Sequence, residues 1–131
     1  AQSGFEYVLL SACALGRTDD AFGEPLGFLS ASFGYRTRAG IGWLTEVPDD
    51  AACLFSLAFQ FALRRRLAAG TQVAAWTRAF YETRRAIGEG HWPAGFDAWL
   101  TAQATQGEAL LPAAPPQALR RVLPWVIVLG A

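Results

Sequence analysis

The chain has 131 residues, with eleven basic and eleven acidic side chains, so its formal net charge is zero at pH 7. Hydrophobic residues make up 53% of it and charged residues 17%, which is typical of one packed domain and excludes a disordered segment. The balanced charge leaves no strong field to attract nucleic acid, and no basic stretch is interleaved with aromatic residues. Direct nucleic-acid binding is therefore not expected.

Membrane insertion, metal binding and disulfide chemistry are not expected either. The longest apolar run, residues 122–129, contains Pro124 and is far shorter than the roughly 20 residues that span a bilayer. Cys13 and Cys53 form no CxxC pair, and with one histidine they predict neither a metal site nor a disulfide framework. A reducing cytosol fits this cysteine usage, and no cofactor is implied. The absence of methionine, even at position 1, indicates a piece of a longer polypeptide.

The first predicted element is a strand over Phe5–Leu10, which does not alternate after Glu6, as in a strand buried on both faces. A polar loop follows, and Glu24–Pro25 begins a helix that closes at Gly34. Ala39–Leu44 predicts a second strand, weakened by its glycines.

The second half is predicted to be mostly helical. Pro48-Asp49-Asp50 opens a long helix, from about residue 51 to 69, whose Arg64–Arg66 run is interpreted as a solvated cationic end. Thr71 caps another helix with a single apolar stripe along it. That stripe consists of Val73, Trp76, Phe80, Thr83 and Ile87. A short helix after Pro93, a proline-rich loop over residues 107–117 and a strand over residues 126–129 complete the chain.

The predicted fold class is α/β, because apolar strands that alternate with long helices favour a mostly parallel sheet. The expected architecture has three layers: a doubly wound sheet with helices on both faces. Such sheets bind ligands beyond the carboxyl ends of their strands. Cys13 follows the first strand and Asp49 follows the second, so both are expected to face one crevice although 36 positions separate them.

Cys13 is the candidate nucleophile. A reactive cysteine needs thiolate character, which a nearby base, a positive charge or a helix N-terminus can supply. A polar loop after a buried strand suits this role, but from the residues alone an unreactive buried thiol is the alternative. Cys53 is predicted to be structural, because it falls among apolar residues at a helix start. His91, the single histidine, is predicted to lie at the surface or to pack against a loop.

Four segments in chain order carry a resemblance to a known family. They are Tyr7–Cys13 (YVLLSAC), Gly27–Ala31 (GFLSA), Leu44–Ala51 (LTEVPDDA) and Pro124–Gly130 (PWVIVLG). The first is similar to a hydrophobic strand followed by S-A-C, and the last to a closing strand. Together they resemble the CHAT family, caspase-like cysteine peptidases related to separase and often fused to TPR repeats.

The resemblance implies that residues 1–131 form the C-terminal part of a single caspase-like domain that is incomplete at its N-terminal side. Cys13 takes the place of the nucleophile, and Asp49 takes that of the acidic residue in a loop that helps form the S1 pocket in relatives. Asp50 and Glu46 are weaker candidates. A carboxylate there suits an arginine or lysine before the scissile bond.

The catalytic histidine of the family is implied to lie upstream of Ala1. The pKa of a free cysteine thiol is about 8.5, so without that base the thiol stays protonated at neutral pH. The isolated piece is therefore expected to be inactive.

The leading hypothesis is therefore a cytoplasmic cysteine endopeptidase acting on a protein or peptide. Its expected partners are the upstream segment with the histidine and a TPR or other sensor domain. The alternative is an inactive scaffold that binds a protein partner, which Thr45, in place of the family's tryptophan, favours. A flavodoxin-like small-molecule domain is a third class, but the chain lacks a phosphate loop.

Overall fold

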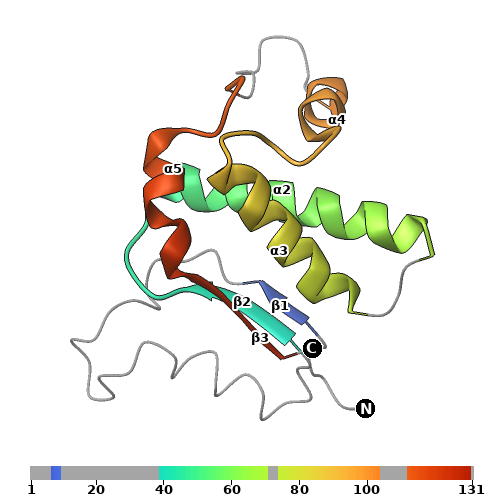
Figure 1. Ribbon diagram of the computed structural model, residues 1–131, viewed down its shortest axis with the longest axis horizontal. Coiled ribbons are helices and arrows are strands. Elements are labelled where there is room, and N and C mark those ends of the chain that lie inside the picture. The colour runs from blue at the N-terminus through green and yellow to red at the C-terminus, as the bar shows by residue number, and fades with distance from the viewer. Residues whose placement is uncertain (1–6, 10–38, 71–73, 104–111, 131) are drawn as a thin grey trace.

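The computed structural model describes residues 7–9, 39–70, 74–103 and 112–130. Helices make up most of this part, and a small sheet lies against them (Figure 1). Cys13, the predicted helix over residues 24–34 and the first part of the predicted loop over residues 107–117, up to residue 111, lie outside the described residues.

The sheet has three strands in the order β1-β2-β3: β1 (Tyr7–Leu9), β2 (Ala39–Trp43) and β3 (Val126–Gly130). β1 runs parallel to β2, with Val8 opposite Gly40. β3 runs antiparallel to β2, with Ile41 opposite Val128. Each of these strands overlaps a predicted one, so the apolar runs located them correctly.

The longest helix, α2 (Asp49–Ala68), begins two residues before the predicted start. Pro48 precedes it, and two aspartates occupy its first turn, where negative charge suits the positive end of the helix dipole. The chain leaves the helix through Gly70, whose φ of 85° lies in the left-handed region that favours glycine.

The second long helix, α3 (Ala75–Gly88), buries the predicted apolar stripe. Trp76, Phe80, Thr83 and Ile87 are all buried, whereas Val73 and the predicted cap Thr71 lie outside the described residues. Ala74 precedes the helix with a φ of 54°, an uncommon conformation for a residue with a Cβ.

Three short elements complete the described chain: α4 (Phe96–Gln103), α5 (Gln117–Val122) and the 3-10 helix η3 (Leu123–Trp125). α4 lies on the predicted short helix after Pro93. α5 was not expected from the sequence. It leads through η3 directly into β3, next to the start of α2 (Figure 1).

Aromatic side chains join the sheet to the helices. Phe55 of α2 meets Trp43 of β2 at 5.5 Å between ring centroids and Phe80 of α3 at 6.0 Å. Phe59, one turn further along α2, lies edge-on to Trp76 at 4.8 Å. These buried rings hold α2 and α3 side by side on one side of the sheet (Figure 1).

The predicted fold class, a three-layer, doubly wound, mostly parallel sheet with helices on both faces, is wrong for the described residues. Only the β1–β2 pair is parallel, and β3 runs the opposite way. The reason lies in the connection. The amide of Leu44, just after β2, donates to the carbonyl of Trp125, just before β3, at 2.8 Å. β3 therefore starts at the edge where β2 ends, and it must run back along β2.

Candidate functional site

The carboxyl edge of the sheet is where the sequence places its candidate site. Because β1 and β2 are parallel, Leu9 and Trp43 end at the same edge. The chain after β2 crosses this edge with Val47 buried and then enters α2. Trp125, half exposed at the end of η3, borders the same edge through its bond to Leu44. The ends of two strands and the start of one helix therefore converge here.

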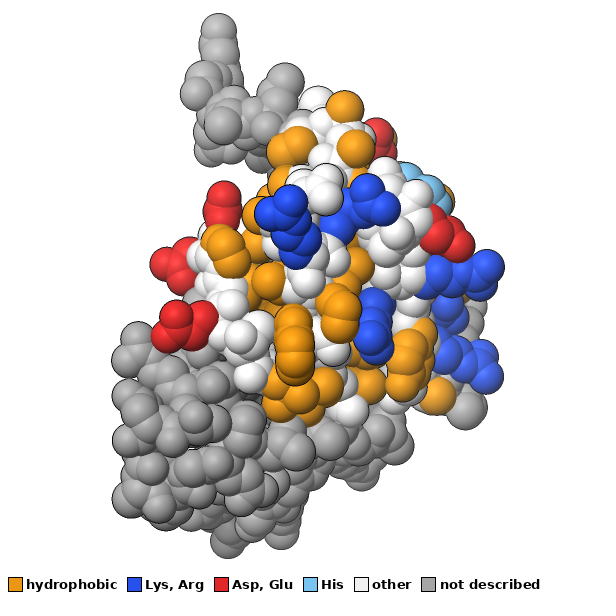
Figure 2. All heavy atoms as spheres, turned by 60° about the vertical axis from the view of Figure 1, so that its left-hand side comes forward, with side chains coloured by type: hydrophobic (Ala, Val, Ile, Leu, Met, Phe, Trp, Pro, Cys, Tyr) orange, Lys and Arg blue, Asp and Glu red, His pale blue; other side chains and the backbone are white. Residues whose placement is uncertain are grey.

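Asp49 and Asp50, the predicted substrate-binding residues, occupy the first turn of α2 and are both exposed. The carboxylate of Asp50 accepts a hydrogen bond from the amide of Ala51 at 2.9 Å. The nearby Glu46 is also exposed. In Figure 2, most of the acidic side chains on this face lie together at one margin of the molecule. An acidic, solvent-accessible turn therefore begins six positions beyond the end of β2.

The structure describes only one of the two cysteines, Cys53. Cys13 lies outside the described residues, so its surroundings stay a prediction. Cys53, predicted to be structural because it falls among apolar residues at a helix start, is exposed on α2. It is not buried with those residues because α2 buries only one face, on which Ala52 and Phe55 lie, and position 53 falls on the opposite side.

His91 lies at the surface, as expected. Its Nε2 is 3.3 Å from Glu89 Oε1, and its side chain is 63% exposed. Its Nδ1 lies 3.2 Å from the carbonyl oxygen of Trp92. These contacts lie in the turn that follows α3. The next residue, Trp92, is buried, and its indole donates a hydrogen bond to the carbonyl of Pro112.

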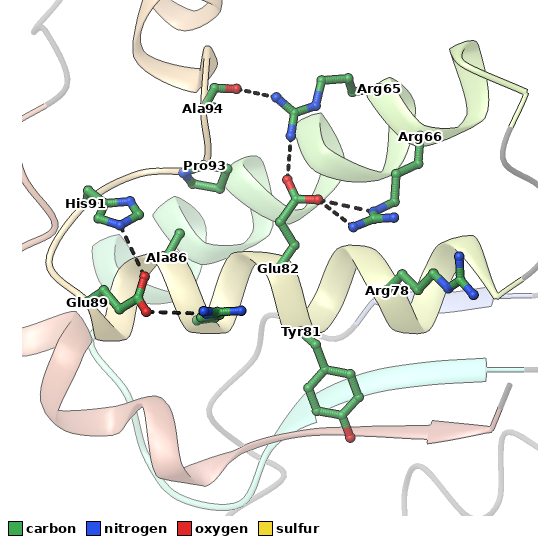
Figure 3. A pocket seen from close by; sticks show the side chains of 11 residues that line it. Arg65, Arg66, Arg78, Tyr81, Glu82, Ala86, Glu89, His91, Pro93 and Ala94 are labelled. Carbon is green, nitrogen blue, oxygen red and sulfur yellow. Dashed lines mark hydrogen bonds and ion pairs between the residues drawn. The ribbon is translucent and has the colours of Figure 1, made fainter.

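A hollow lies between α2, α3 and the turn that follows α3 (Figure 3). Its volume is about 550 Å³, and arginines make up half of its polar lining residues. The four arginines are Arg65, Arg66, Arg78 and Arg85. Tyr81, Glu82, Glu89 and His91 lie among them. We call it the α2–α3 hollow.

Ion pairs across the α2–α3 hollow hold its two walls together. Glu82 of α3 accepts from Arg65 at 2.6 Å and from Arg66 at 2.8 Å, both on α2. Arg65 also donates to the carbonyl of Ala94 at 2.6 Å (Figure 3). On the outer side, Arg85 lies 3.3 Å from Glu89. The arginine run was expected to be a solvated helix end, and two of its three members instead bridge to the next helix.

The Arg64–Arg66 run and His91 were noted in the sequence, but neither was predicted to belong to a hollow between two helices. Arg78, Tyr81 and Arg85 follow at helical spacing opposite the apolar stripe of α3, and this signal could have grouped them. The contacts of Arg65 and Arg66 with Glu82 join positions 16 and 17 residues apart on two helices. No local pattern indicates such a pairing.

Within the described ranges, no three histidine, cysteine or acidic side chains come together to hold a metal ion. No helix in the same ranges is both long and apolar enough to cross a membrane.

The chain was compared with protein-family models, curated proteins and solved structures, and no significant match was found in any of the three comparisons.

Proposed function

We propose that the chain is part of a cysteine-dependent endopeptidase of the CHAT family, with Cys13 as the nucleophile. A histidine from the polypeptide upstream of Ala1 supplies the base. The observation that carries this proposal is the parallel pairing of β1 with β2. It brings the end of the strand that leads to Cys13 to the same edge as the end of the strand that leads to Asp49.

Chain length supports a shared site at this edge. Cys13 is four positions after Leu9, and an extended chain spans at most roughly 3.6 Å per position, so at most roughly 14 Å can separate the two Cα atoms. Asp49 and Asp50 lie on the described part of the same edge and are open to solvent. A peptide bound along the edge can therefore reach both the thiol and the carboxylates.

The proposed reaction proceeds by acyl transfer. The imidazole takes the proton of Cys13, and the thiolate attacks the peptide carbonyl carbon. The C–N bond breaks, the amine leaves with the proton from the imidazolium, and water then hydrolyses the thioester. Asp49, with Asp50 beside it, attracts an arginine or lysine side chain before the scissile bond. A reducing cytoplasm is the proposed compartment, because it keeps the thiol free.

The test uses the polypeptide with its upstream segment and fluorogenic peptides that carry arginine, lysine or glutamate before the cleaved bond. Turnover is expected after the basic residues only. Cys13→Ala should abolish it, and the matched change Cys53→Ala should not. Asp49→Asn is expected to raise KM for the arginine peptide with a smaller effect on kcat. Full turnover by Cys13→Ala would remove this residue from the mechanism, and binding of peptides without any turnover would support the inactive scaffold.

A further inference from the structure

A second hollow continues the α2–α3 hollow across α3. It has a volume of about 470 Å³ and lies between α3, α5 and η3, with Arg84, Arg120 and Pro124 among its lining residues. Tyr81 and Arg85 line both hollows. The side chain of Tyr81 stands out between them, and 54% of the residue is exposed. The two hollows therefore form one elongated surface across the outer face of α3, which we call the arginine face.

The arginine face concentrates positive charge in a chain whose net charge is zero. Six of the eight described arginines line it, together with two carboxylates, Glu82 and Glu89. Figure 2 shows basic side chains over the middle and one margin of the molecule, with most of the acidic ones at the opposite margin. The segregation produces a local field that the overall composition hides.

Several arginines of this face retain unused hydrogen-bond donors. Glu82 already neutralises much of the charge of Arg65 and Arg66. In contrast, Arg78 and Arg84 form no ion pair with any described residue. Arg120 donates one bond, to the carbonyl of Gly88 at 3.2 Å. One of these arginines lines the α2–α3 hollow and two line its continuation, so the donors are spread along the whole surface.

We propose that the arginine face binds an extended acidic segment of a partner protein. Guanidinium groups bind carboxylates through paired hydrogen bonds, and two shallow hollows in succession suit an extended chain better than a compact ligand. Tyr81, between the hollows, offers a ring against which an apolar side chain of the segment packs.

The mixed polarity of the face favours a peptide over a nucleic acid. Glu82 and Glu89 repel the carboxylates of a peptide as well as phosphates, but a peptide also carries backbone amides that can donate hydrogen bonds to them, and a phosphate backbone has no such donors. Binding through phosphates also needs a continuous basic stripe, and these two carboxylates interrupt it. The proposal goes beyond the peptidase function and does not depend on the chemistry of Cys13.

The experiment measures fluorescence anisotropy of a labelled peptide of about ten residues, half of them glutamate and one of them leucine, with the whole protein. The Cys13→Ala background prevents cleavage. The double change Arg78→Glu with Arg84→Glu reverses, in each hollow, one charge that has no ion-pair partner among the described residues, and it should weaken binding by about tenfold or more. Arg64→Glu is the matched control, because Arg64 is exposed on α2 and lines neither hollow.

Three outcomes overturn the proposal: no binding of the peptide, equal weakening by Arg64→Glu, or preference for a single-stranded RNA of similar length that the double change removes. Thermal unfolding of each variant shows whether it is folded. If the double variant does not fold, the single change Arg78→Glu, at an exposed position, replaces it and should still weaken binding several-fold.

Discussion

The ring of Trp43, the last residue of β2, meets the ring of Phe55 edge-on, with centroids 5.5 Å apart and planes at 73°. Both residues are 1% exposed. The contact spans the turn between β2 and α2, so it holds the acidic first turn of α2 at the edge of the sheet. The position of Asp49 relative to the strand ends therefore depends on this aromatic pair.

Replacing Phe55 should destabilise the protein more than replacing another phenylalanine of the same helix. Phe55→Ala is expected to lower the free energy of unfolding by about 3–5 kcal/mol, because it leaves a cavity between Trp43 and Phe80. Phe61→Ala, at a half-buried position against Phe96, should cost less. Denaturant unfolding measures both values, and an equal or reversed order would contradict the packing described.

Because the backbone of Ala74 is left-handed, we expect glycine at this position to stabilise the folded protein. Its φ of 54° strains a residue with a Cβ by about 1–2 kcal/mol, and glycine removes this strain at some cost in chain entropy. Ala74→Gly should therefore raise the free energy of unfolding by about 0.5 kcal/mol. Ala75→Gly, one residue further and within α3, should lower it by about 1 kcal/mol. Thermal unfolding under identical conditions distinguishes the two, and a loss of stability in both variants would exclude the strain.

The exposed thiol of Cys53 should react with Ellman's reagent in the folded protein. Cys53→Ser is expected to remove one reactive thiol and to change the free energy of unfolding by less than about 0.5 kcal/mol, as for other surface substitutions. Under the proposed function it leaves peptidase turnover unchanged, and the thiol that still reacts is then Cys13. Slow labelling of Cys53 that requires denaturant would show that it is buried.

Glu82 is expected to oppose acidic ligands while it stabilises the helix pair. Glu82→Gln removes the charge that holds Arg65 and Arg66, so it should lower the free energy of unfolding by about 1 kcal/mol or less. The same change frees two guanidinium groups and should strengthen binding of the acidic peptide. Asp97→Asn, at an exposed position outside both hollows, is the control. Weaker peptide binding by Glu82→Gln would argue against the arginine face.

Periodicity located the elements that depend on local patterns. The stripe of Trp76, Phe80, Thr83 and Ile87 predicted α3 and its buried side, because residues three and four apart share one face of a helix. The apolar runs at residues 39–44 and 126–129 likewise predicted strands, and β2 and β3 lie there. Two features were missed because their signals were short or ambiguous. α5 is only six residues long, and Cys53 falls among apolar residues near the start of α2 although it is exposed.

The sequence alone therefore determined the two long helices, α4, the three strands and much of the core of the described residues, since burial imposes regular spacing on neighbouring residues. Tertiary structure decided the direction of β3, the convergence of Leu9 and Trp43 at one edge, and the pairing of Arg65 and Arg66 with Glu82. These features join segments far apart in the chain. The pattern of an apolar strand does not indicate whether the strand runs parallel or antiparallel to its neighbour. The residues around an arginine do not indicate which helix supplies its ion-pair partner. Only packing in three dimensions therefore specifies the direction of β3 and the pairing of Arg65 and Arg66 with Glu82.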